Sequence, residues 1–197
     1  MTAPTGKMKA LHTGLLSAFL GLAFVLPPAD AATGEIDELM ASLGLGQPRS
    51  EVLAPDFALP NLNGRTTRLS DYRGKLVLLN FMDTNCHWCR KEMPTLQNLY
   101  DAFKNENFVI TVVFVDRSGI SAVAPFMEKT GYTFAADSGL LDPYGAVSGK
   151  YLVSGTPTSF LIDGRGRIIA LGIGYRDWSR PEARLLIKRL LGLGQPK

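Results

Sequence analysis

The chain has 197 residues, of which 46% are apolar and 20% are charged, and its formal net charge is +3. This length and composition suit one globular domain with a substantial core. The charge bias is small and the basic residues form no dense stripe, so binding to nucleic acid is not expected.

The first 31 residues have the pattern of a secretory signal. Two lysines precede an apolar run at residues 14–26, and small residues follow it. We therefore predict a signal peptide over residues 1–31, cleaved after Ala31 or Ala32. An uncleaved membrane anchor remains the alternative, although the run is short for a span of about 20 residues. Either way, the rest of the chain is expected in the periplasm or another exported compartment.

Residues 32–50 are expected to form a lead segment or linker, in which a short helix breaks at two glycines and a proline. A single domain is predicted over residues 51–194. It opens with an N-terminal β-hairpin, because two short strand patterns flank the turn dipeptide Asn63–Gly64.

The core of the domain is predicted from alternating strand and helix patterns. Residues 76–83 form a near-continuous apolar run, which is typical of a strand buried on both faces. Apolar residues recur at helical spacing over 87–104, and 108–116 is a second buried strand pattern. A helix is predicted over 121–131 and a short strand over 133–137.

The C-terminal part is predicted to hold a hairpin over 158–163 and 167–174, then a helix over 179–191. Arg176 is expected, with the other basic residues, on the solvent-exposed face of this last helix. Trp178 is expected to be a packing residue. Strands that alternate with helices before a terminal hairpin indicate an α/β fold with a mixed sheet.

Both cysteines lie in the stretch NFMDTNCHWCRKEMP, as the pair Cys86-x-x-Cys89. Haem attachment needs a histidine directly after the second cysteine, where this chain has Arg90. Structural zinc needs four ligands, and His87 is the only histidine outside the predicted signal, so no metal site is predicted. A close-range structural disulfide is the alternative, although such a small loop stabilises a fold little.

The place of the pair in the chain favours redox chemistry. At a helix N-terminus, the dipole and the free N–H groups stabilise a thiolate, which makes Cys86 the predicted nucleophile. Cys89, one turn further on, is the predicted resolving thiol that opens a mixed disulfide. No cofactor is predicted beyond the redox-active Cys86–Cys89 disulfide.

Five motifs occur in an order that resembles a known family: LVLLNF, CxxCRKEMP, LLDPYGAV, GTPTSFLID and GRIIALGIG. Over roughly residues 50–192 the chain resembles the exported TlpA/ResA-like thiol–disulfide oxidoreductases of the thioredoxin superfamily. The resemblance implies a thioredoxin-like fold, in which helices flank a mixed central sheet. It also implies a central insertion of the TlpA-like type between Val113 and Gly155, which adds a helix and a strand.

Two prolines match positions of functional interest in that family. Pro94 matches the proline that kinks the active-site helix. Pro157 matches the cis-proline of a loop whose backbone groups bind the substrate chain in that family. Cis peptide bonds are largely confined to proline. Thr156 is then expected to contact both substrate and Cys86. The alternative for Pro157 is an ordinary trans turn.

The chain departs from the family pattern around the cysteines. Asn80 stands where thioredoxin has a buried aspartate, and an amide cannot relay a proton for Cys89. Asp83 is a candidate relay, with a solvated loop carboxylate as the alternative. His87 and Trp88 are predicted to tune the pair: a cationic His87 stabilises the thiolate and raises the potential, and Trp88 contacts substrate or shields Cys89. The alternatives are an exposed ring and simple packing.

The resemblance implies that the protein reduces disulfides of envelope proteins, for example in cytochrome c maturation. A membrane thiol transporter is then the electron donor, and the protein acts as a monomer. A protein disulfide oxidase or isomerase is the alternative, and a copper-binding chaperone on the same fold is the second. Peroxidase activity is disfavoured, because Asp83 stands where peroxiredoxins have a threonine. The redox direction, the substrate and the donor stay open.

Overall fold

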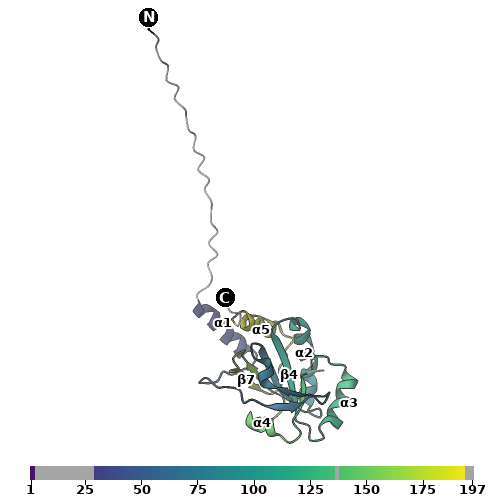
Figure 1. Cartoon of the computed structure of the whole chain (residues 1–197). Helices are drawn as coiled ribbons and strands as arrows, with labels where there is room; N and C mark the ends of the chain where they lie inside the picture. The colour runs from purple at the N-terminus through teal and green to yellow at the C-terminus, as the bar shows by residue number, and fades with distance from the viewer. Residues whose placement is uncertain (3–28, 136–137, 194–197) are drawn as a thin grey trace.

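The computed structural model describes residues 1–2, 29–135 and 138–193 (Figure 1). A five-stranded sheet of order β5-β4-β3-β6-β7 forms its centre, and a second sheet pairs β1 with β2. The elements are α1 (Ala29–Ser42), β1 (Ala58–Pro60), β2 (Thr66–Arg68), the 3-10 helix η1 (Leu69–Tyr72), β3 (Leu76–Met82), α2 (His87–Phe103), β4 (Phe108–Phe114), α3 (Ile120–Thr130), β5 (Gly139–Leu141), α4 (Ala146–Lys150), β6 (Thr158–Ile162), β7 (Ile168–Ile173) and α5 (Pro181–Leu193).

The central sheet is mixed, as predicted. Strand β3 runs parallel to β4 and antiparallel to β6, while β7 pairs antiparallel with β6. Every residue of β3 is buried, because the sheet carries a hydrophobic core on each face. One core takes side chains from α1, α2, α3 and α5, and the other takes them from η1, α4 and the β1–β2 hairpin. The arrangement is the predicted thioredoxin-like α/β fold.

The N-terminal hairpin and the central insertion both form. Strands β1 and β2 pair antiparallel around the turn at Asn63–Gly64. Between β4 and β6 the chain builds α3, β5 and α4, and β5 extends the sheet by pairing parallel to β4. The insertion therefore supplies one of the two edge strands of the central sheet.

The segment expected to be a linker packs as part of the domain. Helix α1 lies beside α5 (Figure 1), and Ile36, Leu39 and Met40 are buried in the core that α5 shares. Gly46 then exchanges two backbone hydrogen bonds of 2.8 Å with Leu171 of β7. Apolar burial and sheet-edge bonds therefore tie α1 and Gly46 to the domain, within the segment expected to be a lead segment or linker.

The predicted signal peptide falls mostly outside the described residues, since the structure describes nothing over residues 3–28. Helix α1 begins at Ala29, so the predicted cleavage position lies within its first turn. Within the ranges that the structure does describe, no helix is both long and apolar enough to span a membrane.

Two local predictions are wrong. The strand expected over residues 133–137 does not form at Thr133 to Ala135, because the chain turns at Phe134 and Ala135; residues 136–137 lie outside the described residues, and the strand β5 begins at Gly139, whose N–H bonds to the carbonyl of Ala135 (2.8 Å). The last helix begins at Pro181 instead of Ser179, since the Ser179 hydroxyl donates to Asp177 Oδ1 (2.5 Å).

Candidate active site

Cys86 and Cys89 form a disulfide where β3 gives way to α2. Cys86 is the N-cap of α2, and its Sγ accepts a hydrogen bond of 3.1 Å from the N–H of Cys89. Cys86 is half-buried, whereas Cys89 is 1% exposed. The same bond in the reduced form would stabilise a Cys86 thiolate. The geometry thus suits the predicted roles, with an accessible sulfur at the helix N-terminus and a shielded one beneath it.

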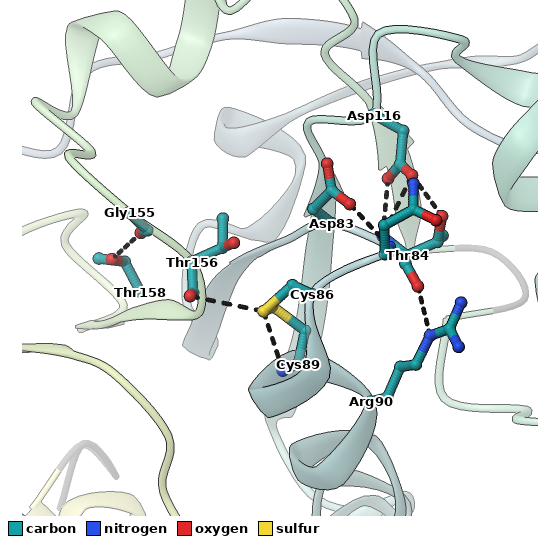
Figure 2. Close-up of a disulfide and its surroundings, with 10 residues drawn as sticks. Asp83, Thr84, Cys86, Cys89, Arg90, Asp116, Gly155, Thr156 and Thr158 are labelled. Atoms are coloured by element: carbon teal, nitrogen blue, oxygen red, sulfur yellow. Dashed lines mark hydrogen bonds between the residues drawn. A yellow bond between two sulfur atoms is a disulfide. The ribbon is translucent and has the colours of Figure 1, made fainter.

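The loop between β3 and α2 is fixed by a buried carboxylate (Figure 2). Both oxygens of Asp116 accept from the N–H of Thr84 at 3.1 Å, and the Thr84 hydroxyl also donates to Asp116. Burial raises the pKa of Asp116, and the two Thr84 groups lower it in part. From the other side, Arg90 Nε donates to the carbonyl of Thr84. Asp116 was not singled out from the sequence, which shows it only as the end of a strand pattern.

Asp83, the relay candidate, accepts a hydrogen bond of 2.7 Å from the N–H of Asn85 and is half-buried. This Asx-type turn shapes the approach to Cys86. The contact supports the plainer alternative of a loop carboxylate over a role as proton relay.

The Thr156–Pro157 peptide bond is cis, as predicted. The Thr156 carbonyl oxygen lies 3.5 Å from Cys86 Sγ (Figure 2). The neighbouring Pro157 carbonyl accepts from the N–H of Gly174 at 2.8 Å, which ties the loop to the end of β7. The expected contact between Thr156 and Cys86 is therefore made by the backbone, and substrate contact by this loop stays a prediction.

A buried acid, Glu92, lies one turn beyond Cys89 on α2 and was missed from the sequence. It is 0% exposed, and residues three apart share a helix face at about 5–6 Å between Cβ atoms. Trp178 Nε1 donates to Glu92 Oε1 over 2.7 Å. Burial raises the pKa of Glu92 from 4.5 to about 7, against partial lowering by the Trp178 hydrogen bond and the Arg176 charge.

The surroundings of Glu92 favour its protonated form. Among the described residues, Glu92 Oε2 and Asn80 Oδ1 are buried without a hydrogen-bond partner. The Asn80 side chain is close enough to affect the pKa of Glu92, and its Nδ2 donates to Ser159 Oγ at 3.0 Å. Burial is the largest of these influences and favours the protonated form of Glu92, whereas the Asn80 side chain lowers the pKa in part.

The prediction that Arg176 lies on the solvent-exposed face of the last helix is wrong. Arg176 precedes α5, is 7% exposed and donates to the carbonyls of Gly174 (2.7 Å) and Gly44 (2.8 Å). Its guanidinium fills the space beside Gly172, where an added Cβ would meet Nη2 at 2.0 Å. Arg176 thus joins the segment after α1 to the end of β7, while its charge acts on Glu92. Trp178 is fully buried, as expected of a packing residue.

His87 and Trp88, the predicted tuning residues, are both exposed at the first turn of α2. Their ring centroids are 5.3 Å apart, and Trp88 also contacts Tyr175 at 5.7 Å. The Lys91 ammonium lies 5.1 Å from the Trp88 ring centroid and 4.9 Å from that of Tyr175. At 51% exposed, Trp88 faces solvent, so the geometry fits contact with substrate better than shielding of Cys89.

No group of three or more His, Cys, Asp or Glu side chains is placed to hold a metal ion in the part of the chain that the structure describes. No observation on these residues supports the copper-chaperone alternative. What the site can do chemically rests on the sulfur pair, the buried carboxyl beneath it and the cis-proline loop beside it.

Comparisons with known proteins show which family the chain resembles. The family model described as the AhpC/TSA family matches residues 51–171. Thiol-disulfide oxidoreductase ResA of Geobacillus kaustophilus is 43% identical over 115 residues, which are 58% of this chain and 64% of the relative. ResA of Bacillus subtilis is 40% identical over 121 residues, 61% of this chain and 65% of the relative. The chain thus spans a little under two thirds of the length of these relatives.

Among solved structures, a crystal structure from Chlorobium tepidum is similar over 72% of this chain and 97% of its own. It is provisionally named a thiol:disulfide interchange protein DsbE, with a TM-score of 0.64 and 31% identity.

Proposed function

The chain belongs to the AhpC/TSA family and has the thioredoxin fold, and from this premise we propose that it is a thiol–disulfide oxidoreductase that reduces disulfides of exported proteins. The observation that carries the proposal is the Cys86–Cys89 disulfide at the N-terminus of α2, beside the cis Thr156–Pro157 bond. The names of the ResA relatives support the same activity.

In the proposed reaction, the Cys86 thiolate attacks one sulfur of a substrate disulfide and releases the other as a thiolate. A mixed disulfide forms between Cys86 and the substrate. Cys89 then attacks Cys86 Sγ, which closes the intramolecular disulfide and releases the second substrate thiolate. Two electrons pass to the substrate, and the enzyme pair ends oxidised. A dithiol donor must reduce it by the same exchange in reverse.

Cys89 must lose a proton before it attacks, and Glu92 is the group that we assign to this step. It lies on the same helix face one turn away, and its pKa of about 7 suits reversible proton exchange near neutral pH. The Thr156 and Pro157 backbone is the proposed contact for the substrate chain beside the mixed disulfide.

We further propose an exported location, apocytochromes c among the substrates and a membrane thiol transporter as donor, with the protein acting as a monomer. These finer assignments follow from the likeness to ResA-type proteins and from the signal pattern at residues 1–31. No cofactor is proposed beyond the sulfur pair.

Oxidation of substrate thiols is the second candidate, and the start of α2 favours it. The first turn has no acidic residue, and His87 follows Cys86 directly. A helix N-terminus without acidic residues stabilises a thiolate, as would a cationic ring at His87, and a stabilised reduced form makes the pair more oxidising.

A redox titration of the Cys86–Cys89 couple decides between the two directions. A potential near about −270 mV, as in thioredoxin, supports reduction, whereas one near about −120 mV, as in DsbA, supports oxidation. The activity itself is tested with single variants. Cys86→Ala should abolish disulfide exchange, and Cys89→Ala should trap a mixed disulfide with a substrate peptide. Exchange that persists in Cys86→Ala would rule the mechanism out.

A further inference from the structure

A set of side chains beside the disulfide has no part in the exchange steps above. We call it the aromatic rim and define it as Trp88, Lys91, Ile173 and Tyr175. Trp88 is 51% exposed and Ile173 is 63% exposed, and Trp88 packs against Tyr175. Large apolar side chains that gather on the surface mark interaction sites.

The aromatic rim lies where the substrate residues next to a cysteine joined to Cys86 would have to lie. Trp88 is two residues from Cys86, and Tyr175 follows Gly174, whose N–H binds the Pro157 carbonyl. Ile173 pairs with Thr158 at the end of the sheet. The rim and the cis-proline loop therefore border Cys86 together, from α2 and from β7.

The aromatic rim carries a positive charge at the N-terminus of a helix, which is an unusual place for one. Helices generally carry acidic residues in the first turn, because these offset the positive end of the dipole. The first turn of α2 has none, and His87, Arg90 and Lys91 stand at its start. Such a departure from a local rule beside an active site points to function.

Of the two side chains Arg90 and Lys91, Lys91 is the one available to a partner. Arg90 is engaged with the Thr84 carbonyl and lies over the Phe126 ring at 5.7 Å. Lys91 has no carboxylate within ion-pair distance among the described residues, and two rings hold its ammonium in place. A cation that is already positioned loses less side-chain entropy when it forms an ion pair.

We propose that the aromatic rim selects substrate polypeptides that carry an aromatic side chain and a carboxylate within a few residues of the target disulfide. The aromatic group stacks on the exposed face of Trp88, and the carboxylate pairs with Lys91. The inference rests on the proposed thiol–disulfide exchange at Cys86 and adds a substrate class to it.

Three synthetic peptides test the selection. Each contains one intramolecular disulfide, and they differ only in the two residues beside the first cysteine: Glu-Phe, Lys-Phe or Glu-Ala. The rate constant kcat/KM is measured for each peptide with a dithiol donor in excess. The protein should prefer Glu-Phe over Lys-Phe by about fivefold, and over Glu-Ala by about the same factor. The first preference should shrink at high salt.

Variants assign the preference to the rim. Lys91→Glu should reverse the preference between Glu-Phe and Lys-Phe, and Trp88→Ala should remove the advantage of Glu-Phe over Glu-Ala. Each ratio is taken within one variant, so a change in thiol reactivity cancels. Lys188→Glu, an exposed position on α5, makes the same charge change and should keep the wild-type ratios.

Equal rates on the three peptides, or an unchanged preference in Lys91→Glu, would overturn the inference and leave the exchange mechanism standing. A protein that reduces none of the peptides would refute the proposed function, and the selection with it.

Discussion

The indole N–H of Trp178 donates a hydrogen bond of 2.7 Å to Glu92 Oε1, and both side chains are fully buried. The Thr95 hydroxyl reinforces this link, since it accepts from the N–H of Trp178 at 3.1 Å and donates to the Glu92 carbonyl at 2.7 Å. The segment before α5 therefore fixes the buried acid one turn beyond Cys89.

Glu92→Gln should remove a pH dependence of stability. The native pKa of about 7 lies above the ordinary 4.5, so the native state binds a proton between these values that the unfolded chain releases. The free energy of unfolding is then highest at low pH and should fall by roughly 2–3 kcal/mol between about pH 5 and pH 8. Glutamine keeps an acceptor for Trp178 but cannot ionise, so the variant should lose this fall.

Urea unfolding of the oxidised protein at the two pH values measures the effect. Glu38→Gln, at an exposed position on α1, is the matched control and should keep the wild-type dependence. If Glu92→Gln shows the same fall as the wild type, Glu92 does not hold its proton in the way described.

Arg176→Met should lower stability and raise the pKa of Glu92 further. Methionine fills similar space but leaves the carbonyls of Gly44 and Gly174 without their donor, at a cost of about 1–3 kcal/mol. It also removes the positive charge that favours ionised Glu92. Denaturant unfolding across pH should show both changes. Arg184→Met, exposed on α5, should show neither.

Asp116→Ala should destabilise the loop between β3 and α2. The change leaves the N–H and hydroxyl of Thr84 without their acceptor, at an expected cost of about 1–3 kcal/mol. Asp116→Asn retains one acceptor oxygen and should cost less. Hydrogen exchange at the Thr84 amide gives a local readout, and an unchanged exchange rate in Asp116→Ala would contradict the contact.

Leu39→Ala should test whether α1 is an integral part of the domain. Leu39 is 8% exposed in the main core, so its truncation should cost about 2 kcal/mol or more of unfolding free energy. Glu38→Ala, next to it on the exposed side, should change stability by less than about 0.5 kcal/mol. Equal effects of the two changes would mean that α1 docks only loosely.

Local patterns predicted most of the fold and the sulfur pair. The apolar run at Leu76–Met82 and the helical spacing that follows it each act over a few residues, and the structure has the expected element at each. The cis bond before Pro157 was expected from the family resemblance, and it is present. The displaced strand after α3 is a small error of the same local kind.

The groups that the sequence did not reveal depend on contacts between distant segments. Arg176 is buried because Gly44 and Gly174 supply carbonyls on either side of it. For Glu92 the sequence does contain a signal. It lies between Cys89 and Met93 on the apolar face of α2, where a charged residue is out of place.

The close approach of the Arg176 guanidinium to Gly172 also has an evolutionary consequence. Any side chain at position 172 would occupy the space that the guanidinium fills, so the two positions are not free to change independently. Among homologous chains, a buried arginine at position 176 should occur with glycine at position 172. Lineages that replace this glycine should have exchanged the arginine for a smaller residue, and with it the cation that acts on the acid beneath their cysteines.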